Sequence, residues 1–241
     1  FDILTVDSKT PKQDLPTEIF GFKIWHTLGF TFPLYNQISL TFDVPELKGA
    51  TILERKQPEL IHVTSPGFIV FPALLYARAF QIPIVMSYHT HLPSYATNYL
   101  NFIPYIERMS WGMLRFAHKR ADLTLVTSPQ MKAELESEGI PRVDVWRKGI
   151  DTERFNPTFR SQSMREEMTD GNPDCFLMIY VGRLGAEKRL KDIRPMLERI
   201  PNSRFCVVGK GPQMKELQEY FEGTNTKFMG QMSRDALSQA F

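Results

Sequence analysis

The chain has 241 residues, of which 42% are hydrophobic and 23% are charged, and this composition is typical of a folded protein with a buried core. Lys and Arg together number 29 and Asp and Glu 27, so the net charge of +2 gives no bulk electrostatic attraction to nucleic acid. Two cysteines exclude a disulfide-dense scaffold and a zinc site built from cysteines. No apolar run reaches the roughly 18 residues of a membrane-spanning helix.

Short β-branched runs alternate with longer helical segments along the chain. Most of the strand-like runs are continuously apolar, which is typical of strands covered on both faces. The alternation predicts the α/β class with doubly wound parallel sheets. The predicted order is strands at 3–6 and 22–28, helix 46–56, strand 60–63, helix 71–80, strand 84–87, helix 104–119, strand 123–126, helix 129–138, strand 143–146, strand 177–181, helix 190–200, strand 204–208, helix 212–221, strand 227–229 and a helix from 233.

A polar stretch at 151–173 interrupts this alternation. It contains Asn156-Pro157, Gly171 and Pro173 as breakers and has no strand signal. We therefore predict two α/β domains, at 1–155 and 156–241. The first residues already read as a strand without an initiator Met or targeting segment, and the last residues lie within a helix, so both domains are expected to be incomplete.

Chemically distinctive residues follow several of the predicted strands. In open parallel α/β sheets, ligands bind outside the carboxyl ends of the strands. The segments at these ends are 64–67 (TSPG), 87–91 (SYHTH), Gly182-Arg183 and 209–212 (GKGP). Together they predict a ligand site along this edge.

Arg183 and Lys188 are the strongest candidates for an anion site. The run from Gly182 to Lys188 follows a strand and is predicted to enter a helix, whose first amides and dipole would favour an anion. A guanidinium fork and an ammonium both suit phosphate oxygens. The competing interpretation is a surface Arg with a solvated Glu187–Lys188 pair. Gly209, Gly211 and Pro212 repeat the strand–glycine–helix pattern, although many such turns need glycine for geometry alone.

His89 and His91 flank Thr90 directly after a predicted strand, and three interpretations remain open. Such a pair can bind zinc, but the only later histidine is His118, on a predicted helix, so further zinc ligands are lacking. A histidine can instead bond to nearby backbone carbonyls. His89 can also face a cleft and hydrogen-bond a sugar hydroxyl.

The segment at 99–120 is apolar on more than one side and carries several basic side chains. This pattern is typical of an interfacial membrane helix and also of a core helix in an α/β domain. Both interpretations stay open.

Several of these runs, taken in order, resemble the motifs of retaining GT-B glycosyltransferases of family four, in the glycogen-synthase-like superfamily. The likeness covers nearly the whole chain and is strongest, at 146–161, to the sulfolipid-forming sulfoquinovosyltransferases within that family. The runs that carry it are 84–91 (IVMSYHTH), 121–128 (ADLTLVTS), 146–161 (WRKGIDTERFNPTFRS), Gly182-Arg183 with Glu187-Lys188, 65–67 (SPG) and 33–35 (PLY).

The resemblance implies a GT-B fold in which two Rossmann-like domains face a cleft. It implies that Arg183 and Lys188 hold the donor diphosphate and that Gly182, Gly209, Gly211 and Pro212 lie near the nucleotide. His89 would lie near the transferred sugar, and Gly149 and Asp151 would shape the floor of the cleft. No metal or cofactor is implied, because the UDP-sugar is itself a substrate.

For the function, the resemblance implies retaining transfer of sulfoquinovose from UDP-sulfoquinovose to diacylglycerol by a peripheral protein of the chloroplast envelope membrane. The alternatives are a lipid glycosyltransferase with another nucleotide-sugar donor and a nucleotide-binding piece without turnover. Two parts of the family pattern are absent from the 241 residues: the glycine-rich loop after the first strand, and the carboxylate pair late in the second domain. Lys148 also replaces the Asn of many relatives. By itself the chain is therefore expected to be inactive.

Overall fold

The computed structural model describes residues 1–31, 39–65, 67–147 and 149–240. Three sequence features, the run at 33–35, Pro66 and Lys148, lie outside these residues. Contacts between Cα atoms divide the chain into two compact units, a first unit of residues 1–148 and a second unit of residues 149–241. The predicted domain boundary after residue 155 stays a prediction.

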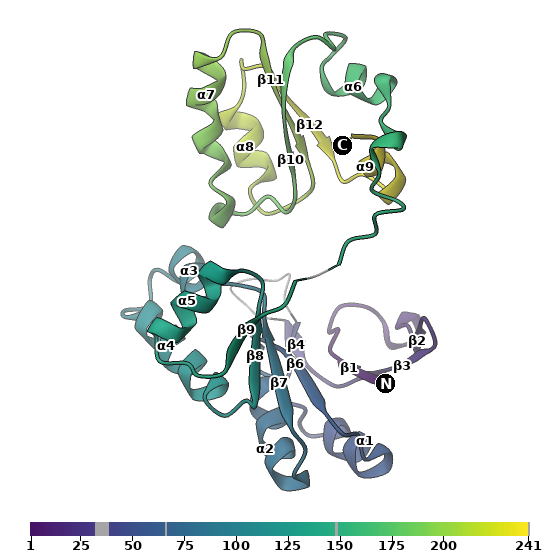
Figure 1. Ribbon diagram of the computed structural model, residues 1–241, viewed down its shortest axis with the longest axis vertical. Helices are drawn as coiled ribbons and strands as arrows, with labels where there is room; N and C mark the ends of the chain where they lie inside the picture. The colour runs from purple at the N-terminus through teal and green to yellow at the C-terminus, as the bar shows by residue number, and fades with distance from the viewer. Residues whose placement is uncertain (32–38, 66, 148, 241) are drawn as a thin grey trace. The chain divides into compact units, whose positions relative to one another are not determined.

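The first unit is built on a parallel four-stranded sheet with the order β6-β7-β8-β9 (Figure 1). Its strands are β6 (Ile61–Ser65), β7 (Ile84–Tyr88), β8 (Leu123–Val126) and β9 (Val143–Val145). Its helices are α1 (Lys48–Lys56), α2 (Val70–Phe80), α3 (Leu92–Tyr99), α4 (Ile106–His118) and α5 (Pro129–Ser137). The strand and helix alternation predicted from the sequence is confirmed in this part of the unit.

The strands nearest the N-terminus form smaller sheets of their own. β1 (Asp2–Thr5) pairs in parallel with β3 (Phe22–His26), and β2 (Glu18–Ile19) pairs antiparallel with β3. β4 (Phe30–Thr31) and β5 (Ser39–Leu40) form an antiparallel pair. Within the described residues, the strands predicted at 3–6 and 22–28 therefore exist but do not pair with the four-stranded sheet.

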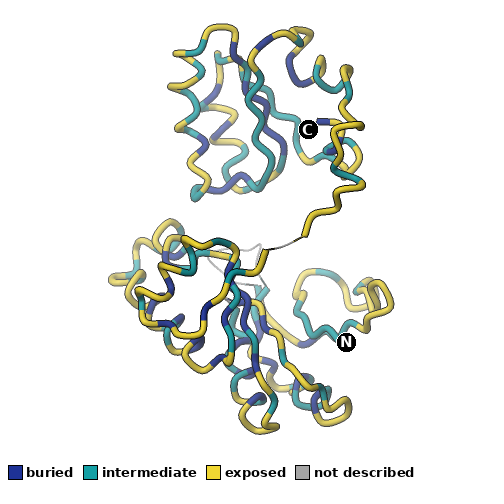
Figure 2. The backbone as a smooth tube through the Cα atoms, in the orientation of Figure 1, coloured by how far each residue is buried: buried dark blue, intermediate teal, exposed yellow. Residues whose placement is uncertain are grey.

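One face of the four-stranded sheet carries the core of the first unit. Ile84, Met86 and Tyr88 alternate along β7 toward this face and are buried against residues of α2, α4 and α5. Val85 and Leu125 point to the other face and are only half-buried. Figure 2 shows the buried positions concentrated in the strands and the inner sides of the helices.

The second unit has helices on both faces of a parallel sheet with the order β10-β11-β12 (Figure 1). Phe205 and Val207 of β11 pack with residues of α8, whereas Cys206 and Val208 pack with residues of α6 and α9. This alternation confirms a strand buried on both faces. The elements are α6 (Gln162–Met168), β10 (Phe176–Val181), α7 (Arg194–Arg199), β11 (Ser203–Val208), α8 (Met214–Tyr220), β12 (Thr226–Gly230) and α9 (Arg234–Ala240), with 3-10 turns η2 (Pro157–Phe159), η3 (Ala186–Lys188) and η4 (Leu190–Ile193).

The structure differs from the predicted elements at three helices. The helix predicted at 190–200 is divided into η4 and α7, and Pro195, which has no backbone N–H, lies in the first turn of α7. α6 lies within the predicted linker and begins after Ser161, whose hydroxyl accepts a hydrogen bond from the Met164 amide at 3.2 Å. α3 begins after His91 with Pro93 in its first turn, where the proline starts a helix rather than breaking it. Among the described helices, none has the length and apolar character needed to span a bilayer.

Candidate functional site

The turns that follow β10 and β11 lie side by side in the second unit. The Gly182 amide donates to the Val208 carbonyl at 3.0 Å, and the Leu184 amide donates to the Lys210 carbonyl at 3.0 Å. The Gln213 amide completes the contact by donating to the Leu184 carbonyl at 3.1 Å. Backbone pairing therefore continues past the ends of the strands, and it holds two predicted site segments together at the carboxyl edge of the sheet.

Two glycines are required for this close approach. Gly209 has φ 139°, and a Cβ atom there would fall within 3.0 Å of the Gly182 carbonyl oxygen. A Cβ atom at Gly211 would overlap the backbone of Leu184 in the same way. Real Cβ atoms do not tolerate such distances from backbone atoms. Pro212 is exposed and lies in the turn that leads into α8.

Arg183 lies half-buried on the first of these turns. The hydroxyl of Tyr180, in β10, donates to the Arg183 carbonyl at 2.8 Å. Burial raises the pKa of Tyr180 above its ordinary value of 10, and the nearby Glu187 carboxylate raises it further. The hydroxyl therefore keeps its proton at neutral pH and remains a donor to the turn.

Lys188 is exposed at the last position of η3, and its amide donates to the Gly185 carbonyl at 3.0 Å. The segment enters a 3-10 helix of only three residues rather than a long helix, and α7 begins only at Arg194. An anion here would be held by the cationic side chains rather than by the amides of a long helix. Neighbouring cations are already paired: Arg189 with Asp192 at 2.7 Å, and Lys191 with Glu216.

Gly149 and Asp151 lie at the start of the second unit and are exposed. The Asp151 carboxylate accepts a hydrogen bond from the Arg154 amide at 3.0 Å, and its carbonyl accepts one from the Phe155 amide at 2.9 Å. Asp151 thus closes a turn. A Cβ atom at Gly149 would meet nothing within 4 Å. The role of these two residues in a cleft stays a prediction.

His89 lies in the first unit, directly after β7, and is half-buried. Its ring centroid is 6.0 Å from that of Trp146, which directly follows β9. The two aromatic rings therefore meet at the carboxyl edge of the four-stranded sheet, although their strands are not neighbours in it. Trp146 begins the run at 146–161 that resembles the family, but no contact between Trp146 and His89 was predicted from the sequence.

His91 has a structural role at the start of α3. Its Nδ1 accepts a hydrogen bond from the Ser94 amide at 3.2 Å, so Nε2 carries the proton and donates to the Glu134 carboxylate at 2.8 Å. The ring also packs edge-on against Trp111, with centroids 5.7 Å apart. Both ring nitrogens are therefore engaged, which does not fit the zinc interpretation. The interpretation in which the histidine bonds to nearby backbone groups fits better, although its backbone partner is the Ser94 amide rather than a carbonyl.

A buried histidine contacts three strands in the first unit. His118, at the end of α4, lies between the Ser65 hydroxyl on Nε2 and the Thr124 hydroxyl on Nδ1, both at 3.0 Å. Its ring packs edge-on against Tyr88, the last residue of β7. Burial lowers the pKa of His118 from 6.5 to about 4, so it is neutral at physiological pH.

Replacing His118 by glutamine is expected to cost less stability at pH 5 than at pH 7. Below pH 6.5 the unfolded wild-type chain binds a proton that the folded chain does not bind until about pH 4. The wild type should therefore lose about 2 kcal/mol between pH 7 and pH 5 through this residue, and the variant should not. Urea unfolding of both proteins at the two pH values measures the difference. An equal cost at both pH values would contradict the neutral state of His118.

The sequence pointed to the glycines and the cations of the second unit but not to Tyr180, whose hydroxyl donates to the Arg183 carbonyl. The available signal was a lone hydroxyl-bearing residue in an otherwise apolar strand, two positions before Gly182. It was missed because a tyrosine in a buried strand is ordinarily explained by packing.

The chain is similar to known proteins over most of its length. Residues 7–154 match the sequence profile described as Glycosyltransferase Family 4. The sulfoquinovosyl transferase SQD2 of Arabidopsis thaliana is 36% identical over 236 residues, which are 96% of this chain and 46% of that protein. A GDP-mannose-dependent alpha-mannosyltransferase of Mycobacterium tuberculosis is 33% identical over 181 residues, 75% of this chain and 46% of the relative. The chain thus spans about half the length of these curated relatives.

Solved structures support the fold. Sucrose-phosphate synthase from Thermosynechococcus elongatus superposes with a TM-score of 0.70 at 17% identity, covering 99% of this chain and 62% of that one. Anabaena HepE, solved in complex with UDP-glucose, superposes with a TM-score of 0.59 at 18% identity, covering 91% of this chain and 59% of that one. These similarities confirm the predicted GT-B architecture.

Proposed function

Because the chain belongs to glycosyltransferase family 4, we propose that the full-length protein transfers a sugar from a nucleotide-sugar donor to a lipid. The donor proposed is UDP-sulfoquinovose and the acceptor diacylglycerol, with retention of the anomeric configuration. Support for this choice comes from the 36% identity to a sulfoquinovosyl transferase over nearly all of the chain.

The observation that carries the proposal is the pair of joined turns at the carboxyl edge of the second unit. Gly209 and Gly211 allow the two turns to lie this close together, and the segment after β10 carries the half-buried Arg183 and the exposed Lys188. A guanidinium and an ammonium at the carboxyl edge of a parallel sheet suit the oxygens of a diphosphate. During transfer the bond from the sugar to the diphosphate breaks, and negative charge grows on the leaving UDP. Cationic side chains that contact the diphosphate would stabilise that charge more in the transition state than in the ground state.

His89 is the proposed contact to the transferred sugar. It is half-buried at a strand end, where its ring lies near that of Trp146 and an imidazole nitrogen can bond a sugar hydroxyl. Tyr88 and His91 restrain the backbone on either side, since the Tyr88 hydroxyl accepts the Leu92 amide at 2.8 Å and His91 caps α3. This rigid flank would fix the position of the imidazole.

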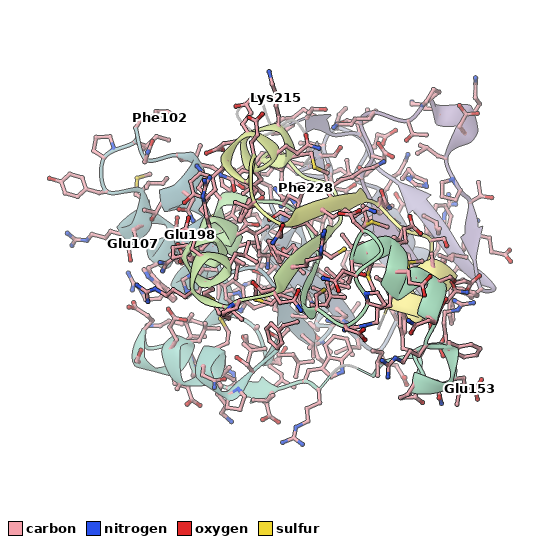
Figure 3. All side chains as sticks on the ribbon, turned by 90° about the horizontal axis from the view of Figure 1, so that it is seen from above. Phe102, Glu107, Glu153, Glu198, Lys215 and Phe228 are labelled. Carbon is pink, nitrogen blue, oxygen red and sulfur yellow. The ribbon has the colours of Figure 1, made fainter. Side chains whose placement is uncertain are left out.

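A diacylglycerol acceptor requires access to a membrane surface, and one segment of the first unit offers suitable residues. Phe102, Tyr105 and Met109 have exposed fractions of 64%, 80% and 60%, around the start of α4, where Arg108 is also exposed. Phe102 and Glu107 lie at the outer edge of the view in Figure 3. Exposed aromatic and basic side chains together suit the interface of an anionic bilayer. We propose a peripheral position at the chloroplast envelope membrane, and the likeness to a plant enzyme supports the chloroplast part of this proposal.

The second candidate donor is GDP-mannose, because several curated relatives are GDP-mannose-dependent mannosyltransferases. The residues of the joined turns suit the diphosphate that both donors share. A nucleotide-binding protein without turnover is the third candidate.

A donor panel with diacylglycerol in liposomes separates these functions. We expect the full-length protein to use UDP-sulfoquinovose with a kcat/KM about tenfold or more above that for UDP-glucose or GDP-mannose. A preference for GDP-mannose would contradict the proposed donor. Binding of UDP without transfer from any donor would favour the protein without turnover.

A further inference from the structure

Tyr180 lies directly beneath the turn that carries Arg183. It belongs to β10, and its ring packs against the buried cluster that includes Leu184, Phe205 and Leu217. The ring is thus part of the core, while the hydroxyl reaches the underside of the turn. The Tyr180 side chain thus has two parts with different roles: the ring packs in the core, and the hydroxyl makes the polar contact with the turn.

The hydroxyl lies against two consecutive residues of the turn. It donates to the Arg183 carbonyl at 2.8 Å, and a Cβ atom placed on Gly182 would lie 2.8 Å from the Tyr180 hydroxyl oxygen. Only glycine at position 182 leaves room for the hydroxyl in this place. The Tyr180 hydroxyl therefore packs against Gly182, and its hydrogen bond fixes the orientation of the peptide group that follows Arg183.

The segment beyond the turn folds back over the same region. The Glu187 carboxylate lies over Gly185, close enough to crowd a Cβ atom there, and its charge acts on Tyr180. Leu184, between Arg183 and Gly185, is fully buried and bonded to Lys210 through its amide. The backbone around Arg183 is therefore held by the second turn on one side and by the Tyr180 hydroxyl on the other.

We propose that Tyr180 is a positioning residue for the donor diphosphate, acting through Arg183. This inference rests on the proposed function, in which Arg183 binds the diphosphate. A phenylalanine ring would fill the same space in the core. The hydroxyl therefore contributes to the orientation of the turn and not to the packing of the core. Misplacement of a phosphate-binding guanidinium by a fraction of an ångström is enough to weaken a bidentate contact.

The test compares UDP with uridine as ligands of the full-length protein. Tyr180→Phe should weaken UDP binding about fivefold, the effect of one hydrogen bond, and should leave uridine binding unchanged. Tyr220→Phe is the matched control, because Tyr220 packs in the same core of the second unit and should change neither ligand. Thermal unfolding of each variant reports the fold separately.

The outcomes distinguish this inference from the proposed function. If Tyr180→Phe weakens the binding of UDP and of uridine equally, Tyr180 has a structural role only. If it changes the binding of neither ligand, Tyr180 has no role in binding. Either result overturns the inference. Lys188→Ala serves as the reference for the diphosphate site itself. If that variant and Tyr180→Phe both bind UDP as the wild type does, the proposed diphosphate site at the joined turns fails. If only Lys188→Ala loses affinity, the inference about Tyr180 alone fails.

Discussion

Replacing Lys188 by alanine in the full-length protein is expected to abolish sugar transfer while leaving the fold intact. The ammonium is exposed at the end of η3, so its removal opens no cavity and breaks no buried contact. Its proposed partner is the diphosphate, whose charge grows as the sugar leaves. Loss of one such preorganised charge lowers kcat by about a hundredfold or more. Steady-state transfer rates and urea unfolding, measured on the same preparation, test both parts of the expectation.

Lys215 provides a matched control for this substitution. It is an exposed lysine of the same unit, on α8, and forms a loose pair with Glu219 at 3.9 Å (Figure 3). Lys215→Ala should change neither the transfer rate nor the stability by a measurable amount. Wild-type turnover by Lys188→Ala would remove the proposed diphosphate role of that lysine, whatever the donor sugar is.

The order of strands and helices could be predicted because it depends on local patterns. β10 and the last four residues of β11 read as apolar runs, and burial on both faces of this sheet explains why they do. The pairing of β1 and β3 apart from β6 could not be predicted, because periodicity identifies a strand but not its neighbour. The division of the helix predicted at 190–200 was also missed, since the same apolar spacing is compatible with a 3-10 turn followed by a short helix.

Within the candidate site, the structure gives Gly209 and Gly211 a geometric role, because each lies against the backbone of the neighbouring turn. The strand–glycine–helix pattern left open that geometry alone needs glycine there, and the predicted place of these residues near a nucleotide stays a prediction. Histidines proved ambiguous, because the same imidazole can cap a helix, as His91 does, or join a buried network, as His118 does. Which of these roles a histidine has depends on contacts between segments distant in sequence, and no local pattern records them.

The largest effect on stability is expected from Gly209→Ala. A Cβ atom at this position meets the Gly182 carbonyl oxygen, which is backbone and cannot rotate away, and φ 139° is itself unfavourable for alanine. The turn after β11 must therefore separate from the turn after β10, which breaks the bonds from Gly182 to Val208 and from Leu184 to Lys210. We expect a loss of about 3 kcal/mol or more in the unfolding free energy of the second unit.

Gly149→Ala is the control, since its Cβ enters open space and should shift the unfolding free energy by about 0.5 kcal/mol at most. Urea unfolding monitored in the second unit decides between the two expectations, and equal stability of both variants would show that the contact between the turns does not hold this edge of the sheet together.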